Sequence, residues 1–283
     1  MRFAVTVVSP PRYFPSAAFR DVAESIHYGL QALGHDSVLT SEGNLPGRKH
    51  IVLGANLLLR HPIPLANDAI LYNLEQVDAG SSWFPPQMID VFRRYTVWDY
   101  NNQNVLALES LGVRVAHVLP IGYVKELTRI THAVESDVDV LFIGSMNSRR
   151  EKVLDELYEL RLRVGIVTSA FGEERDSFIG RAKLMLNLHY YESKILEMVR
   201  ISYLLANHCA VLSEHSADPS EDNALADGVA FSDYSHIARR ARELVDSPEE
   251  RAHLARRGFE VMNSCSMIEY LGNALRTLEL VSE

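Results

Sequence analysis

The sequence predicts an α/β fold in two parts, and three observations lead to that prediction. The chain has 283 residues, which is enough for two domains of about 130–150 residues each. Short apolar runs alternate with helical segments, as they do in βαβ units with parallel sheets. A polar stretch over residues 131–137 interrupts the alternation, which then starts again. We therefore expect two Rossmann-like βαβ domains facing a cleft, residues 1–132 and residues 138–283, the second with C-terminal helices.

In the first half, five apolar runs are expected to be strands: residues 3–8, 50–53, 69–74, 95–98 and 113–119. Helices are expected over residues 16–33 and 102–111, because Gly34 and Gly112 follow them in the position of a C-cap.

The second half repeats this pattern. Its expected strands are residues 138–143, 164–168, 184–189, 210–213 and 229–231. Its expected helices are residues 149–160, 193–206, 236–245, 248–262 and 268–281, and Pro248 suits a first helical turn because that position needs no N–H. Ligands of such sheets bind outside the carboxyl ends of the strands, so candidate site residues are sought there.

Composition excludes several classes of protein. The net charge of -9 and the lack of long Lys/Arg runs argue against a nucleic-acid partner, whose phosphates require a basic surface. The apolar start of the chain is too short for a secretory signal and is followed by Pro10 and Pro11, and no apolar stretch is as long as a membrane span. We expect a cytoplasmic protein with at most peripheral membrane contact.

Several cofactor and catalytic motifs are absent from the sequence. It contains no GxG, no GxxxxGK[ST], no GxSxG and no HExxH, which argues against dinucleotide enzymes, P-loop NTPases and the hydrolases that use the last two motifs. Cys209 and Cys265 belong to no Cys/His cluster, so neither a zinc site nor a disulfide is expected. We expect no cofactor.

A turn of small and polar residues joins an expected strand to an expected helix at residues 144–150. Gly144, Ser145 and Asn147 precede the helix, where free N–H groups and the positive end of the helix dipole favour an anion. Arg149 and Arg150 could add charge-assisted bonds to a diphosphate. The alternative is an ordinary surface helix start with solvated arginines.

A second segment, residues 186–197, runs from a strand end into an expected helix. With residues 144–150 it resembles the donor-binding strand, loop and helix of the GT-B "glycosyl transferases group 1" families and of their spore-maturation-type bacterial relatives. The resemblance covers residues 139–262, although most family glycines are replaced. It implies a GT-B glycosyltransferase whose C-terminal half binds a nucleotide-diphosphate sugar.

The resemblance also implies roles for individual residues. Glu197 stands where the family has a glutamate that hydrogen-bonds the ribose hydroxyls, and Lys194 stands one turn earlier, near the diphosphate. Glu192 matches the first glutamate of the family's E-x7-E pattern, but here the two glutamates are five residues apart. The alternative for Glu197 is a helix-surface carboxylate paired with Arg200 at i+3.

Tyr191 and its neighbour Tyr190 could stack on a nucleobase, and packing is the alternative. A second motif, Asp137-Val138-Asp139, matches the DxD pattern that metal-dependent sugar transferases use to hold manganese. It precedes its strand instead of following it, so we expect solvated linker carboxylates and no metal site.

An inverting transferase also needs a base near the acceptor hydroxyl. Glu75 and Asp99 each follow an expected strand of the first half and are the candidates, with helix caps and loop hydrogen bonds as the alternative. The sequence thus predicts a metal-independent glycosyltransferase acting on an unidentified glycan, protein or small-molecule acceptor. Two alternatives remain open: a GT-B-type sugar-nucleotide epimerase, and a degenerate, non-catalytic sugar-nucleotide-binding subunit.

Overall fold

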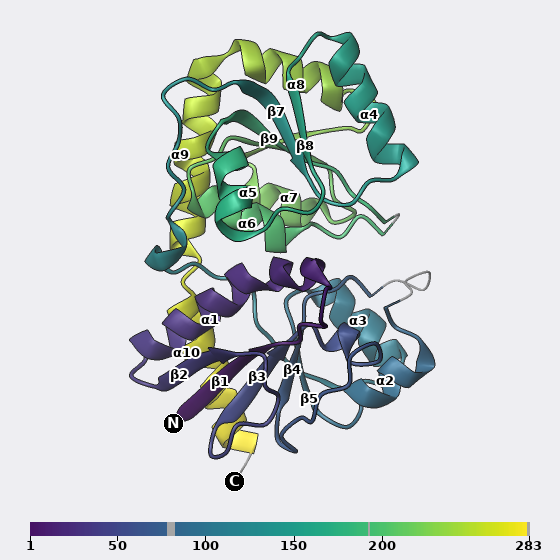
Figure 1. The fold of residues 1–283 in the computed structure, drawn as a ribbon, viewed down its shortest axis with the longest axis vertical. Helices are drawn as coiled ribbons and strands as arrows, with labels where there is room; N and C mark the ends of the chain where they lie inside the picture. The colour runs from purple at the N-terminus through teal and green to yellow at the C-terminus, as the bar shows by residue number, and fades with distance from the viewer. Residues whose placement is uncertain (78–82, 192, 282–283) are drawn as a thin grey trace. The chain divides into compact units, whose positions relative to one another are not determined.

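The computed structural model describes residues 1–77, 83–191 and 193–281. The chain forms two compact units (Figure 1): unit 1 comprises Met1–Glu126 and Ser266–Glu283, and unit 2 comprises Leu127–Cys265. Each contains a parallel sheet with helices between most successive strands, so the predicted α/β fold with two Rossmann-like sheets is confirmed.

The sheet of unit 1 has the strand order β2-β1-β3-β4-β5-β6. The strands are β1 (Arg2–Val7), β2 (Asp36–Thr40), β3 (Lys49–Leu53), β4 (Ile70–Asn73), β5 (Thr96–Asp99) and β6 (Val115–Val118). The helices are α1 (Arg20–Ala32), α2 (Pro86–Phe92), α3 (Asn102–Ser110) and α10 (Met267–Val281), with short 3-10 turns at Phe14–Phe19, Ala55–Leu57 and Lys125–Leu127.

The sheet of unit 2 has the order β11-β10-β9-β7-β8. The strands are β7 (Val138–Ile143), β8 (Val164–Val167), β9 (Ala182–Asn187), β10 (Val211–Glu214) and β11 (Val229–Ser232). The helices are α4 (Ser148–Glu159), α5 (Gly172–Ile179), α6 (Met198–Ala206), α7 (Pro219–Leu225), α8 (Ile237–Asp246) and α9 (Pro248–Ser264). In the part of the chain that the structure describes, no helix combines the length and apolarity that a membrane crossing would need.

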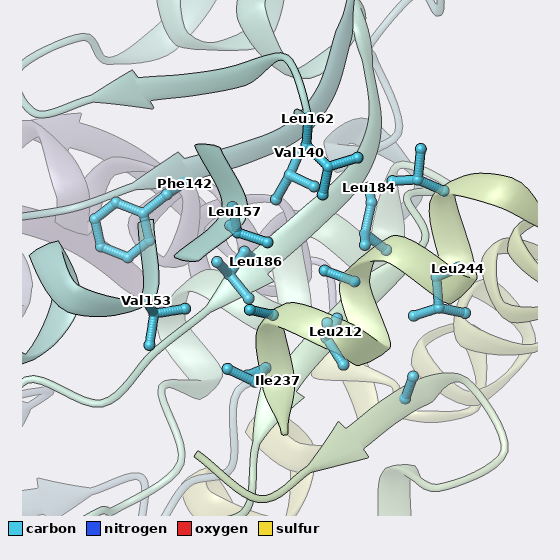
Figure 2. Packing of buried hydrophobic residues seen from close by; sticks show 14 of the residues in the cluster. Val140, Phe142, Val153, Leu157, Leu162, Leu184, Leu186, Leu212, Ile237 and Leu244 are labelled. Carbon is cyan, nitrogen blue, oxygen red and sulfur yellow. The ribbon is translucent and has the colours of Figure 1, made fainter. Parts of the chain in front are cut away.

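The core of unit 2 follows from the alternation of side chains along its strands. Val140 and Phe142 of β7 face the same side as Leu184 and Leu186 of β9, and α4 and α8 cover them with apolar residues such as Leu157 (Figure 2). This packing fixes the strands rigidly, and their carboxyl ends carry the polar residues considered below.

The predicted domain boundary needs a correction at the C-terminal end. We expected residues 138–283 to form one domain, but α10 groups with unit 1, where it packs beside α1 (Figure 1). A Cβ at Gly29 would lie 2.7 Å from Leu271 Cδ1, so the two helices meet at a glycine. Met267 and Leu271 are completely buried there.

The segment before the expected linker is held by unit 2. Asn207 Oδ1 accepts hydrogen bonds from the N–H groups of Arg129 (2.8 Å) and Ile130 (2.9 Å), and its Nδ2 donates to Leu127 O at 2.9 Å. Unit 2 therefore begins at Leu127, ahead of the polar stretch that marked the boundary in the sequence.

Other differences concern short or polar elements. The sequence analysis missed β2, α2, α5 and α7, of which α5 carries few apolar residues and α2 and α7 start at a proline. The helix expected over residues 193–206 begins only at Met198, and the one expected from residue 16 begins at Arg20 after a 3-10 turn.

Replacing Leu271 by alanine tests the assignment of α10 to unit 1. Both tryptophans of the chain, Trp83 and Trp98, lie in unit 1, so their fluorescence reports its unfolding. We expect Leu271→Ala to lower the free energy of unfolding by about 2–5 kcal/mol, the usual cost of such a cavity. Urea titrations followed by fluorescence would measure it. The half-exposed Ile268 on the same helix is the matched control, and an unchanged midpoint for Leu271→Ala would contradict the assignment.

Candidate functional site

The strand order of unit 2 places a topological switch point between β7 and β9. The chain leaves β7 to form β8 on one side, and then returns through α5 to form β9 on the other. Crevices at the carboxyl ends of such strands are the usual ligand sites of open parallel sheets. The loop at residues 144–147 and the segment at residues 188–197 both begin at this edge.

The predicted turn after β7 leads directly into α4. Asn147 is the N-cap, and its Oδ1 accepts a hydrogen bond from Arg150 N at 2.9 Å. Gly144 has φ +148°, and a Cβ there would lie 3.0 Å from Arg200 Nη2 and 3.4 Å from Arg150 Nη1. Glycine therefore lets two guanidinium groups approach the end of β7.

Arg150 is buried, so a solvated surface arginine is the wrong description of it. Its Nη1 donates to Ser145 O at 2.6 Å and its Nη2 donates to Leu188 O. Its guanidinium lies over the rings of Phe142 and Tyr190, each at 5.1 Å. Burial, and then the neighbouring charge of Arg200, lower the pKa of Arg150 to about 10.

Arg149 and Lys194 share one buried carboxylate, that of Glu214 at the end of β10. Arg149 Nη2 pairs with Glu214 Oε1, and Lys194 Nζ lies 3.5 Å from the same oxygen. Arg149 is also stacked over the ring of Tyr234 at 4.1 Å. The side chain of Arg149 is 29% exposed and that of Lys194 is 43% exposed, so both can still reach a ligand.

Glu197 lies at the N-cap of α6, one residue before the helix begins. Its Oε2 accepts from Asn187 Nδ2 at 3.0 Å and lies 3.0 Å from His189 Nδ1, while its Oε1 lies 3.8 Å from Arg150 Nη2. Its side chain is only 13% exposed. Glu197 is thus no helix-surface carboxylate, and Arg200 donates instead to Asn187 Oδ1 at 2.6 Å.

The contacts that Glu197 and His189 make overcome the effect of burial on the pKa values of both groups. Burial alone would raise the pKa of Glu197, but His189 and then Arg200 and Asn187 lower it. Burial alone would lower the pKa of His189, but the contact with Glu197 and the charge of Glu214 raise it. Both groups therefore favour their charged forms.

These residues bring more positive than negative charge to the strand ends. We use the name cationic cluster for Arg149, Arg150, Lys194 and Arg200 with the carboxylates of Glu197 and Glu214. Four cations meet two carboxylates, and the remaining positive charge suits an anion. Four of the six were predicted as site residues from the sequence. Arg200 was considered there only as a surface partner of Glu197, and Glu214 was not predicted, nor were Asn187 and His189 beside them.

Tyr190 and Tyr191 follow β9. The Arg150 guanidinium lies over the Tyr190 ring. The two tyrosine rings meet edge to face with centroids 5.0 Å apart. Glu192 falls outside the described residues.

The carboxylates of the DxD motif are paired with cations at the amino end of β7. Asp139 is buried and bonds Arg163 Nη2 and Lys183 Nζ, each at 2.8 Å, so it is not solvated as expected. Asp137 is exposed and pairs with Arg181. Arg163 and Lys183 hold the pKa of Asp139 well below its usual value. Among the described residues, no group of three or more His, Cys, Asp or Glu side chains is arranged to hold a metal ion.

In unit 1, Asp99 ends β5 and is completely buried. Asn73 Nδ2 (2.7 Å), Asn101 N (2.9 Å) and Asn104 Nδ2 (3.1 Å) all donate to its carboxylate. Burial nevertheless raises the pKa of Asp99 to about 7. Asp99 does not cap α3, because Asn101 does so by accepting from Gln103 N at 2.7 Å.

Glu75 follows β4 and is partly exposed. Asn56 Nδ2 donates to its Oε1 at 3.3 Å, and Asn104 Nδ2 donates to its backbone carbonyl at 3.0 Å. Burial raises the pKa of Glu75 to about 7 as well. Asn104 contacts both acids, so the structure brings Glu75 and Asp99 into one hydrogen-bonded network.

Three residues that were not predicted share one sequence signal. Asn73, Asn187 and Glu214 are each the last residue of a strand whose other residues are largely apolar. A polar residue at that position points to the carboxyl edge of a parallel sheet, where sites form. The signal is weak, because the ends of short strands are hard to place from sequence.

No protein-family model matches the chain. Uncharacterized protein L140 of Acanthamoeba polyphaga mimivirus is 25% identical over 225 residues, which cover 74% of this chain and 71% of that protein. Uncharacterized protein L138 of the same virus is 30% identical over 95 residues, only 11% of its length. These relatives are viral, whereas the resemblance implied bacterial ones.

Several solved structures match nearly the whole chain. A DNA-modifying β-glucosyltransferase, studied with and without uridine diphosphoglucose, has a TM-score of 0.61 at 11% identity and covers 99% of this chain and 100% of its own. AviGT4, a glycosyltransferase of avilamycin A biosynthesis, has a TM-score of 0.59 at 12% identity. The match covers 98% of this chain and 97% of AviGT4. A putative UDP-N-acetylglucosamine 2-epimerase from Listeria monocytogenes has 0.53 at 9% identity, covering 98% and 96%. At these identities the likeness shows the fold alone, which is GT-B.

The pair of His189 and Glu197 should make the stability of unit 2 depend on pH. The raised pKa of His189 stabilises the fold below its usual value of 6.5, and this is lost as pH rises through the folded value. The lowered pKa of Glu197 stabilises the fold above 4.5, and this is lost on acidification. Glu197→Gln should therefore lower the free energy of unfolding most between pH 5 and 6, by about 3–5 kcal/mol, and by less at pH 8.

Chemical denaturation followed by circular dichroism at several pH values would measure this difference. Glu243→Gln, which removes an exposed partner of Arg239 and Arg240, is the control and should change stability by less than about 1 kcal/mol. A cost of Glu197→Gln that is the same at every pH would exclude the coupling to His189.

Proposed function

We propose that this protein is a glycosyltransferase that binds a nucleotide-diphosphate sugar in unit 2 and transfers the sugar to an acceptor without a metal ion. The observation that carries the proposal is the cationic cluster at the switch point between β7 and β9. The GT-B fold of the matching structures supports it, since two of the three are glycosyltransferases.

In this proposal Arg149 and Lys194 contact the diphosphate, because both side chains are partly exposed beside the strand ends. In the free protein Glu214 neutralises them, and a diphosphate would replace part of that contact with charge-assisted bonds. The backbone at Ser145, with the N-terminus of α4, adds N–H donors, whereas Gly144 N already donates to Val167 O at 3.0 Å. These groups stabilise the negative charge that develops on the leaving nucleotide. In metal-dependent enzymes a metal ion stabilises that charge.

Arg150 and Arg200 act as positioning residues, since both guanidinium groups are deep in the protein. They hold Glu197 and Asn187 in place. Glu197 Oε1 accepts no hydrogen bond from the described part of the chain, so it retains capacity for a ribose hydroxyl. This supports the role that the family resemblance implied for Glu197.

For the acceptor hydroxyl we propose Glu75 of unit 1 as the base. It is partly exposed, and a pKa of about 7 suits a group that must take up a proton near neutral pH. Asp99 is completely buried, so we assign it the positioning of Asn73 and Asn104 instead of direct chemistry. The acceptor is a hydroxyl-bearing glycan, protein or small molecule.

The epimerase alternative has one specific point in its favour, which is the fold match to a putative epimerase. An epimerase converts its sugar nucleotide without an acceptor. Incubating the protein with UDP-sugars alone and identifying the products would decide between the two activities, since a transferase without acceptor yields at most slow hydrolysis.

Donor binding is tested by calorimetry with UDP in the presence of EDTA. We expect binding that EDTA does not change, and a loss of roughly tenfold in affinity for Lys194→Ala, equal to about one charge-assisted hydrogen bond. Arg239→Ala, which removes an exposed arginine of α8, is the control. Binding that disappears in EDTA would revive a metal site, and no binding of any nucleoside diphosphate would overturn the donor site.

The role of Glu75 is tested by the pH dependence of turnover. For the wild type, kcat/KM should rise with pH and level off above about 7, because the carboxylate form is the base. Glu75→Gln should lower kcat by about 10²–10⁴-fold and remove that rise. Glu109→Gln, at an exposed glutamate of the same unit, should behave as wild type. An unchanged pH profile in Glu75→Gln would show that another group is the base.

A further inference from the structure

The loop after β10 presents a histidine that the proposed mechanism does not use. His215 follows Glu214 directly, and its ring stacks on Phe231 with centroids 5.6 Å apart and planes 20° apart. Its Nδ1 lies 2.8 Å from Asp222 Oδ2 in α7. The side chain is 49% exposed. The ring is thus held on one edge and one face while the rest is open to solvent.

Asp222 is well placed to fix this ring. The carboxylate is buried, and it also accepts from Ser216 N, at 3.1 Å to Oδ1 and 3.2 Å to Oδ2. Both of its oxygens are therefore tied to the His215 loop. A carboxylate on Nδ1 sets the orientation of an imidazole and leaves Nε2 as its working atom. His215 Nε2 has no hydrogen-bond partner in the described part of the chain.

Backbone hydrogen bonds connect the His215 loop to the cationic cluster. His189 Nε2 lies 3.1 Å from His215 O, and His189 itself pairs with Glu197. Ala217 N donates to Lys194 O at 3.0 Å. Glu214, the residue before His215, holds Arg149 and Lys194. The backbone of the His215 loop therefore lies beside the groups that we assign to the diphosphate.

We propose that His215 is a phosphate ligand of the donor site, donating from Nε2 to a phosphate oxygen of the nucleoside diphosphate, and that Asp222 is its positioning residue. This inference rests on the proposed function. With a proton on each ring nitrogen, Nδ1 donates to Asp222 and Nε2 donates to a phosphate oxygen. The ring also adds a donor outside the Glu214 ion pairs, so it needs no exchange of partners when the ligand binds.

The competing explanation is that the pair of His215 and Asp222 only holds the loop. Two substitutions separate the explanations. In His215→Asn the side-chain amide replaces Nδ1 and can keep the contact with Asp222, but nothing replaces Nε2. In His215→Gln the longer amide replaces Nε2 and can still donate to a ligand, while the contact with Asp222 is weakened.

The test is calorimetry of UDP, GDP, ADP, CDP and dTDP with the full chain and its variants. For the diphosphate that the wild type binds, we expect His215→Asn to lose roughly tenfold in affinity, and His215→Gln to lose clearly less. Asp222→Asn should lie between them. Melting temperatures would verify that the half-exposed His215 variants stay folded.

Each result supports or overturns the inference. A wild type that binds a diphosphate no better than His215→Asn does would overturn the role of His215 and leave the proposed function intact. Binding retained in His215→Asn and lost in His215→Gln would show a purely structural pair. A wild type that binds none of the five diphosphates would overturn the proposed function and this inference with it.

Discussion

The buried guanidinium of Arg150 is the constraint on which the carboxyl edge of the second sheet depends. An unpaired charge inside a protein costs several kcal/mol, so its surroundings must compensate it. Here the carbonyls of Ser145 and Leu188, the Glu197 carboxylate and two aromatic rings do so. These partners come from the loop after β7 and the segment after β9, so one side chain joins the two segments that the strand order brings together.

The two units treat buried carboxyl groups in opposite ways. Around Glu197 and Glu214 the neighbours are cations, which keep the carboxylates charged and make them part of a fixed anion-attracting field. The side chains that donate hydrogen bonds to the Glu75 and Asp99 carboxyl groups in the described part of the chain are amides, which do not offset burial, and the two pKa values rise to about 7. The first arrangement suits binding and the second suits proton transfer. The proposed transfer needs both, and this fold keeps them on different sheets.

Much of the fold could be predicted because its strands are apolar and its helices end in recognisable caps. Elements such as β2 and α5 were missed because their side chains are polar, and only pairing with β1 or packing beside β9 makes them regular. The place of α10 could not be predicted from its sequence, because the apolar face of an amphipathic helix does not indicate which sheet the helix covers. At the site, the loop at residues 144–150 was found through its residue types. Arg200, Asn187 and Glu214 were not, because their meeting depends on three-dimensional proximity between segments.

The grouping of α10 with unit 1 has a consequence for how the chain is made. Unit 1 is discontinuous, since the contact of Gly29 with Leu271 spans all of unit 2. During synthesis Leu127–Cys265 is complete before α10 exists, so the α1 surface that α10 will cover is still open at that stage. Contacts this distant in sequence form slowly and leave apolar surface exposed in the meantime. All residues of unit 2 are thus synthesised before the last residues of unit 1.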